Sequence, residues 1–170
     1  MMKLKFLLTL STILLISCNS QNGYSDLDKL YSDFVLYLKD SNNENLKSYC
    51  DKICLDQETV NYMKKNNFSY RGVPEELEKR KIDPSGIGGK YYKYVLRFKE
   101  KLMHQNQLEN LKYIGREQDG EELYNEKLNI YVTETFILME SGGDTIRCKL
   151  GEMFKINDKW KSFTSPKLGW

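Results

Sequence analysis

The apolar residues of this chain change their spacing once, near Asn110, and this change limits the possible folds more than any other feature. Before Asn110 they recur at every third or fourth position, which is the period of an amphipathic α-helix. After Asn110 they alternate with polar residues, which is the period of a β-strand with one buried face. Because 170 residues are enough for one sizeable core, the pattern predicts a single α+β domain, with helices packed on an antiparallel sheet.

The helical half is expected to contain five helices. Ser25 is the predicted N-cap of the first, and another helix is expected to start at Pro74 because proline suits the first helical position. The glycine-rich segment from Asp83 to Gly89 is predicted to be a loop. The helices are expected from Ser25 to Leu38, from near Glu44 to Ile53, from Gln57 to Lys64, at Pro74–Glu78 and from Tyr91 to His104.

The strand half is expected to form an antiparallel meander. A long strand begins at Leu128 and is followed by a hairpin turn at Gly142–Asp144. Gly151 suits a β-bulge in the next strand, and Asn157–Asp158 predicts another turn. A shorter strand is expected from Leu111 to Arg116.

The charge balance argues against a nucleic-acid partner. The chain has 26 basic and 24 acidic residues, and Lys3 and Lys5 account for the excess of two. Both lie in a segment that we expect to be removed, so the mature chain is neutral and lacks the basic surface that binds phosphate backbones. The sequence contains no recognisable motif for a metal, a cofactor or a catalytic nucleophile with its base.

The first seventeen residues have the features of a secretory signal peptide. Lys3 and Lys5 precede an uncharged apolar run from Phe6 to Ile16. As a helix this run would span roughly 16 Å, about half the hydrocarbon core of a bilayer, so it is too short to cross a membrane. It ends in Leu15-Ile16-Ser17-Cys18, which closely resembles the lipobox of bacterial lipoproteins.

The lipobox resemblance implies a lipid anchor at Cys18. Cleavage would follow Ser17, the Cys18 sulfur would carry a diacylglycerol and the new amine a fatty acid such as palmitate, which makes attachment permanent. Asn19 stands where some lipoproteins have an aspartate that retains them in the inner membrane, so we expect an outer-membrane lipoprotein facing the periplasm. A plain secretory signal with a chance cysteine is the alternative. The expected division is a signal peptide (1–17), a lipidated tether (18–24), the α+β domain (25–165) and a C-terminal tail (166–170).

The strand half resembles the nuclear transport factor two-like superfamily, also called cystatin-like. The resemblance covers about residues 90–164 and rests on two long strands, the hairpin between them and the stretch Asn157–Lys161, which is similar to an ending common in periplasmic members. It implies a cone-like domain with a curved sheet. It implies no particular activity, because these domains include isomerases, binding modules and interaction domains.

Glu134 is the polar residue that we single out as a candidate site. It shares a predicted strand face with Val132 and Phe136, and the helix carrying Tyr94 and Phe98 is expected to close a cone over that face. A carboxylate in such a pocket would have a raised pKa and could act as an acid or a base. The alternative is that this part of the strand is twisted or exposed, or that Arg147 or Lys149 pairs with the carboxylate.

The cysteines of the mature domain suggest structural roles. Cys50 and Cys54 lie four positions apart on one face of a predicted helix, a spacing typical of neither zinc nor thioredoxin-like sites. In an oxidising compartment they form either a disulfide or two free thiols. Cys148 is expected to be a buried thiol, and His104, the only histidine, is expected near a helix C-terminus.

Two classes of function remain. The first is a non-catalytic lipoprotein that binds a small ligand or another envelope protein, and an immunity lipoprotein that blocks a toxin is one form of it. The second is a small cofactor-independent enzyme that uses a pocket carboxylate such as Glu134. Because the sequence shows no nucleophile–base pair, we favour the binding class.

Overall fold

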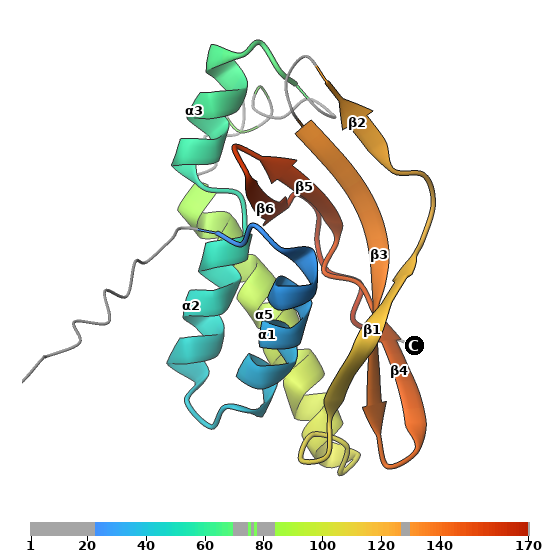
Figure 1. Cartoon of the computed structure of the whole chain (residues 1–170). Coiled ribbons are helices and arrows are strands. Elements are labelled where there is room, and N and C mark those ends of the chain that lie inside the picture. The colour runs from blue at the N-terminus through green and yellow to red at the C-terminus, as the bar shows by residue number, and fades with distance from the viewer. Residues whose placement is uncertain (1–22, 70–74, 76, 78–83, 127–129, 170) are drawn as a thin grey trace, which may run out of the picture.

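The computed structural model of the chain describes residues 23–69, 75, 77, 84–126 and 130–169. The predicted signal peptide, the lipidation site Cys18 and the predicted helix start at Pro74 lie outside these described residues. The described part consists of helices followed by an antiparallel sheet, which confirms the α+β prediction. Figure 1 shows a curved sheet with the helices packed on one of its sides.

The first three helices lie where the apolar period predicts them. Each begins at a polar N-cap whose side chain accepts a hydrogen bond from a backbone N–H of the first turn, and the caps are Asp26, Asn42 and Asp56. The first cap is therefore Asp26, one residue after the predicted Ser25. The helices are α1 (Leu27–Lys39), α2 (Asn43–Ile53), α3 (Gln57–Lys65) and α5 (Pro84–His104).

The predicted loop from Asp83 to Gly89 is wrong, because α5 begins at Pro84 and includes the glycines. Gly88 explains why glycine is used in this helix. A Cβ atom at position 88 would lie 2.2 Å from Oδ1 of Asp51 on α2, so glycine allows the two helices to cross closely. Close packing against α2 thus outweighs the low helix propensity of glycine.

The long strand β3 is the centre of the sheet. The segments β1 and β2 pair along one edge of β3, β4 and β5 pair along the other edge, and β6 pairs with β5. All of these pairings are antiparallel. The strands are β1 (Lys112–Gln118), β2 (Leu123–Asn125), β3 (Ile130–Ser141), β4 (Asp144–Cys148), β5 (Glu152–Ile156) and β6 (Lys159–Ser162).

The predicted turns of the strand half are confirmed by the backbone angles. Gly142 and Gly143 have φ of 61° and 91° and form a two-residue hairpin loop between β3 and β4. Asn157 and Asp158, with φ of 51° and 59°, do the same between β5 and β6. Gly151, with φ of 96°, lies where β4 ends and β5 begins. These positive φ values are where glycine, asparagine and aspartate are tolerated best.

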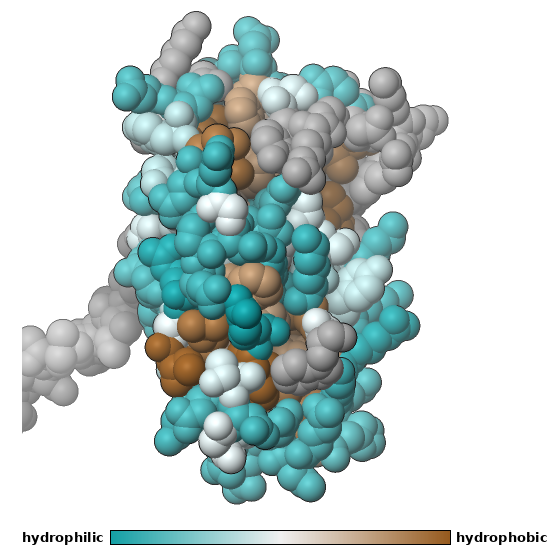
Figure 2. All heavy atoms as spheres, turned by 90° about the vertical axis from the view of Figure 1, so that its right-hand side faces the viewer, coloured by the Kyte–Doolittle hydropathy of each residue, from teal (hydrophilic) through white to brown (hydrophobic). Residues whose placement is uncertain are grey.

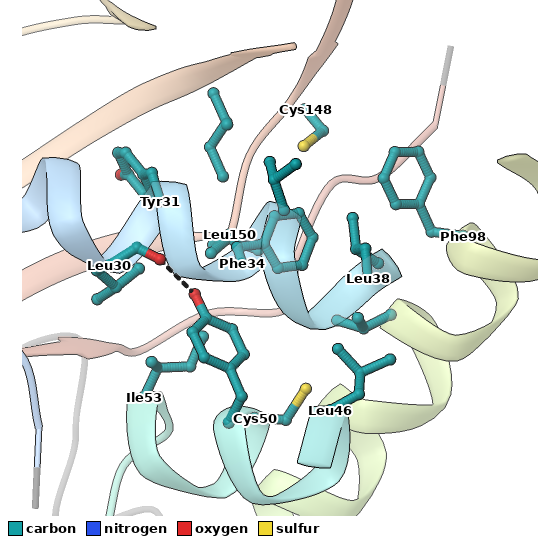
Figure 3. Packing of buried hydrophobic residues seen from close by; sticks show 14 of the residues in the cluster. Leu30, Tyr31, Phe34, Leu38, Leu46, Cys50, Ile53, Phe98, Cys148 and Leu150 are labelled. Atoms are coloured by element: carbon teal, nitrogen blue, oxygen red, sulfur yellow. Dashed lines mark hydrogen bonds between the residues drawn. The ribbon is translucent and has the colours of Figure 1, made fainter. Parts of the chain in front are cut away.

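The main core lies between the helices and the face of the sheet that they cover. Figure 3 shows side chains from α1, α2, α5 and the sheet converging on one region, and the Tyr49 hydroxyl donates to the Leu30 carbonyl there at 3.0 Å. A second, smaller cluster packs α3 against the other end of the sheet, and its buried members are Leu55, Val60, Met63, Ile130, Phe154 and Ile156.

Candidate functional site

The row of β3 that faces the helices is not the row that the sequence predicts. The buried row contains Thr133, Thr135, Ile137 and Met139. Glu134 belongs to the alternate row on the outer face, where its side chain is 28% exposed. Because neighbouring residues of a strand point to opposite faces, an error of one residue in the buried row places every side chain on the wrong side.

The predicted pocket is therefore wrong. Val132, Glu134 and Phe136 point away from the helix α5 that was expected to cover them, and Val132 packs with the second cluster instead. On α5, Phe98 is buried in the main core, whereas Tyr94 is 48% exposed. These five residues do not line one cavity, so the structure gives no support to an enzyme with Glu134 in a closed pocket.

Two threonines make the buried row look polar in the sequence. The Oγ1 atom of Thr135 lies 2.5 Å from the Tyr31 hydroxyl of α1, and the Oγ1 atom of Thr133 lies 3.1 Å from the side chain of Gln118. Each hydroxyl is therefore hydrogen-bonded, that of Thr135 inside the core and that of Thr133 to an exposed side chain, which removes most of the cost of burying it. Tyr31 and Thr135 are far apart in the sequence, so no local pattern reveals their contact.

Glu134 belongs to a cluster of paired charges on the outer face of the sheet. Its carboxylate accepts from the ammonium groups of Lys149 at 3.1 Å and Lys167 at 3.2 Å. Lys149 also pairs with Asp119, and its ammonium lies 4.4 Å from the centre of the Phe136 ring. Burial, with a smaller effect from Lys167, lowers the pKa of Lys149. The pairing predicted as the alternative for Glu134 is thus the one that the structure shows.

This outer face connects β3 to its neighbours through ionic and cation–π contacts. Arg147 on β4 lies 4.3 Å from the Phe136 ring and donates to Glu117 on β1 at 2.7 Å, so it bridges the two strands that flank β3. Figure 2 shows this side of the molecule, where hydrophilic atoms cover most of the surface and apolar atoms form separate patches. The contacts bind neighbouring strands to one another, which indicates a structural role for Glu134.

The segment predicted as a C-terminal tail contributes to the same face. Lys167 and Lys149 exchange two backbone hydrogen bonds, at 3.0 and 2.9 Å. Pro166 is buried and Leu168 packs against the main core. Residues 166–168 are therefore part of the domain, and they add a short antiparallel bridge beside β4.

The cysteines of the described part are buried thiols. Cys50 and Cys54 are both free, so of the two alternatives for this pair the structure has the thiols and not the bridge. Burial raises the pKa of both, that of Cys54 to about 12, and burial also raises the pKa of Cys148. The reactive thiolate is therefore disfavoured at all three positions. His104 lies in the last turn of α5, as predicted, and its side chain is exposed.

Two pockets that the sequence did not predict lie at the C-terminal end of α5. One, of about 440 Å³, is lined by Lys39, Met103, Asn106, Leu108 and Glu109. The other, of about 370 Å³, is lined by Gln105, Gln107, Asp144, Thr145 and Ile146. In the sequence, only the end of the apolar stripe near His104 points to this region. The second pocket could not be predicted locally, because the distant hairpin between β3 and β4 forms part of it.

The loop after α5 is held by backbone and side-chain hydrogen bonds where these pockets form. Asn106 adopts a φ of 55°, and the N–H of Gln107 donates to the Leu102 carbonyl at 2.9 Å, which closes the helix end. The Ser141 hydroxyl at the end of β3 donates to the Gln107 carbonyl at 2.6 Å. These hydrogen bonds fix the backbone of Gln107 in the wall of the second pocket, and neither of them uses the Gln107 side chain.

Comparisons with protein-family models, with curated proteins and with solved structures found no match to this chain. Within the described ranges, no group of three or more histidine, cysteine, aspartate or glutamate side chains is arranged to hold a metal ion. In that same part of the chain, no helix combines the length and the apolar character needed to cross a bilayer.

Proposed function

We propose that this protein is a bacterial lipoprotein, anchored by lipid at Cys18 in the outer membrane and facing the periplasm, whose domain binds another molecule. The proposal rests first on the apolar run and the lipobox-like Leu15–Cys18 segment. The binding role, as opposed to catalysis, is supported by the engagement of Glu134 in ion pairs on an outer face.

The observation that carries the anchoring proposal is the lipobox-like segment, and its short separation from the folded domain in the sequence indicates which side of the domain would face the membrane. Tyr24 is the sixth residue after Cys18, and its carbonyl accepts from the Trp160 N–H of β6 at 2.7 Å. Its ring packs 5.9 Å from that of Tyr49 on α2. Six residues span at most about 20 Å, so lipid at Cys18 would hold the side of the domain around Tyr24 close to the membrane.

We further propose that the domain is a cone-like member of the nuclear transport factor two-like superfamily. Support comes from the helices on one side of a curved sheet and from Gly151, which divides the second long strand into β4 and β5. An experimental structure of the domain, superposed on members of the superfamily, tests this assignment.

The lipid anchor is tested by replacing Cys18 with alanine. We expect the Cys18→Ala chain to accumulate as an unprocessed precursor and to lose the added lipid mass, because no thiol remains to accept diacylglycerol. Phase partitioning in detergent and intact-protein mass spectrometry of the expressed full chain measure both effects. The matched control, Ser20→Ala, changes a residue outside the lipobox and should be processed normally. Identical processing and partitioning of the Cys18→Ala and wild-type chains would contradict the proposal.

A further inference from the structure

The outer edge of β4 carries backbone groups that the sheet does not use. The two-residue hairpin at Gly142–Gly143 closes on Ser141 and Asp144, so these two residues form a hydrogen-bonded pair. Alternate residues of an antiparallel edge strand bond outward, which places the N–H and C=O groups of Thr145 and Arg147 on the free side of β4. Lys149, the next residue of this outward set, already bonds on that side to Lys167.

The free edge is open at Thr145 and Arg147. Both side chains are exposed, and no backbone hydrogen bond from another described residue reaches the outward side of either one. The paired bonds between Lys149 and Lys167 show that this edge accepts an antiparallel strand. A strand that continued this ladder would next pair with Arg147 and then with Thr145.

The pocket of about 370 Å³ adjoins this edge, and one of its lining residues, Gln107, has an unused acceptor atom. Asp144, Thr145 and Ile146 of β4 form one wall, and Gln105 and Gln107 form the other. The Oε1 atom of Gln107 is fully buried and has no hydrogen-bond donor among the described residues. A buried carbonyl oxygen without a donor is costly, so rotation of the Gln107 amide toward an N–H group of a bound molecule would be favourable.

We propose that an extended peptide segment of a partner protein binds in this pocket and adds an antiparallel strand to β4 at Thr145 and Arg147. Its backbone would supply the alternating donors and acceptors that match the outward groups, and one of its N–H groups would bond to Gln107 Oε1 once the Gln107 amide rotates toward the pocket. The exposed carboxylate of Asp144 favours a basic side chain in the segment. This inference rests on the binding role proposed above and names its site, but it does not depend on the lipid anchor.

A phage-displayed library of short linear peptides, selected on the full chain, provides the probe. We expect the selected peptide, once synthesised, to lose affinity about tenfold on Thr145→Pro, which is the loss of one net hydrogen bond. Proline removes the outward N–H, which makes no bond to β3, so circular dichroism should show an unchanged fold. The matched control, Thr145→Val, keeps the N–H and should keep the affinity.

A second measurement leaves the protein unchanged in case the proline variant misfolds. Methylating the backbone nitrogens of the peptide one at a time should weaken binding to the wild-type chain at every second position, because only alternate groups of an added strand face β4. Failure to select any peptide, or binding that resists both Thr145→Pro and methylation, would overturn the inference. The fractionation of Cys18→Ala does not involve β4, so it tests the proposed lipid anchor independently of this inference.

Discussion

Buried lysines connect the helices of this protein at their junctions. Lys99 on α5 donates to the Asp40 carbonyl at 2.5 Å and to Asn43 Oδ1 at 2.8 Å, where α1 ends and α2 begins. Lys161 on β6, only 1% exposed, donates to the Lys52 carbonyl at 2.8 Å and to Asp56 Oδ2 at 2.6 Å, where α2 ends and α3 begins. In both cases an ammonium group meets carbonyls that a helix end leaves unpaired, an arrangement that also suits the helix dipole.

Replacing Asp56 with asparagine tests the value of the buried charge pair. Asparagine is also a good N-cap, so the change keeps the cap of α3 and removes the charge that pairs with Lys161. We expect about 2 kcal/mol of destabilisation in urea unfolding, because an unpaired ammonium stays buried. The control Asp26→Asn alters an exposed cap without a buried lysine and should change stability by no more than about 0.5 kcal/mol. Equal losses at the two positions would refute the argument.

The same pair predicts a pH dependence. Burial raises the pKa of Asp56, but the hydrogen bonds from Lys161 and Thr59 outweigh it and hold this pKa below its ordinary value of 3.8. A carboxyl whose pKa is depressed by folding contributes stability that is present above the unfolded value and is lost as the pH falls through the folded value. The stability difference between wild type and Asp56→Asn should therefore be constant near neutral pH and shrink below about pH 4, as urea titrations would show.

Among the elements, α5 shows most clearly how packing outweighs propensity. The stripe from Tyr91 onward predicts its second half, whereas the glycines of its first turns predict a loop. In the structure those glycines are helical, and Gly88 lies against Asp51 on α2, where a larger residue would overlap it. The composition of this segment indicates only the low helix propensity of glycine. It cannot indicate that the Asp51 side chain of α2 occupies the space where a Cβ at position 88 would be.

Two neighbouring glycines of α5 give a matched test of this explanation. Gly89→Ala should stabilise the protein by up to about 1 kcal/mol, because no atom lies within 4 Å of the added Cβ. Gly88→Ala should instead be destabilising by about 1 kcal/mol, because the new methyl group overlaps Asp51. Removing the obstacle with Asp51→Ala in the Gly88→Ala chain should recover part of the loss. Denaturant unfolding of these three variants and of the wild type measures these differences, and equal effects at positions 88 and 89 would contradict them.

At the scale of the whole molecule, the three cysteines of the described part lie on both layers of the main core. Cys50 and Cys54 belong to α2 and its C-cap, and Cys148 belongs to β4. All three are at most 1% exposed. Alkylation of these thiols therefore reports on separation of the helical layer from the sheet.

We expect none of the three core thiols to be alkylated under native conditions at neutral pH. They are buried, and burial raises the pKa of each. In denaturant without reductant, mass spectrometry should show all three alkylated at the rate of global unfolding. Modification of Cys148 alone under those conditions would mean that Cys50 and Cys54 are bridged, contrary to the structure.

The helices α1 to α3, the hairpin turns and the α+β class could all be predicted because each depends on residues that are close in the chain. Apolar period selects helix or strand, and Gly142 or Asn157 permits a backbone angle that few other residues adopt. The buried face of β3, the helical start of α5 and the pockets beyond His104 depend on contacts between distant residues. Thr135 is a core residue because Tyr31 meets its hydroxyl, and Glu134 is an outer residue because Lys149 and Lys167 pair with it. Local pattern thus determines backbone geometry, whereas the partner across the fold determines which polar group can be buried.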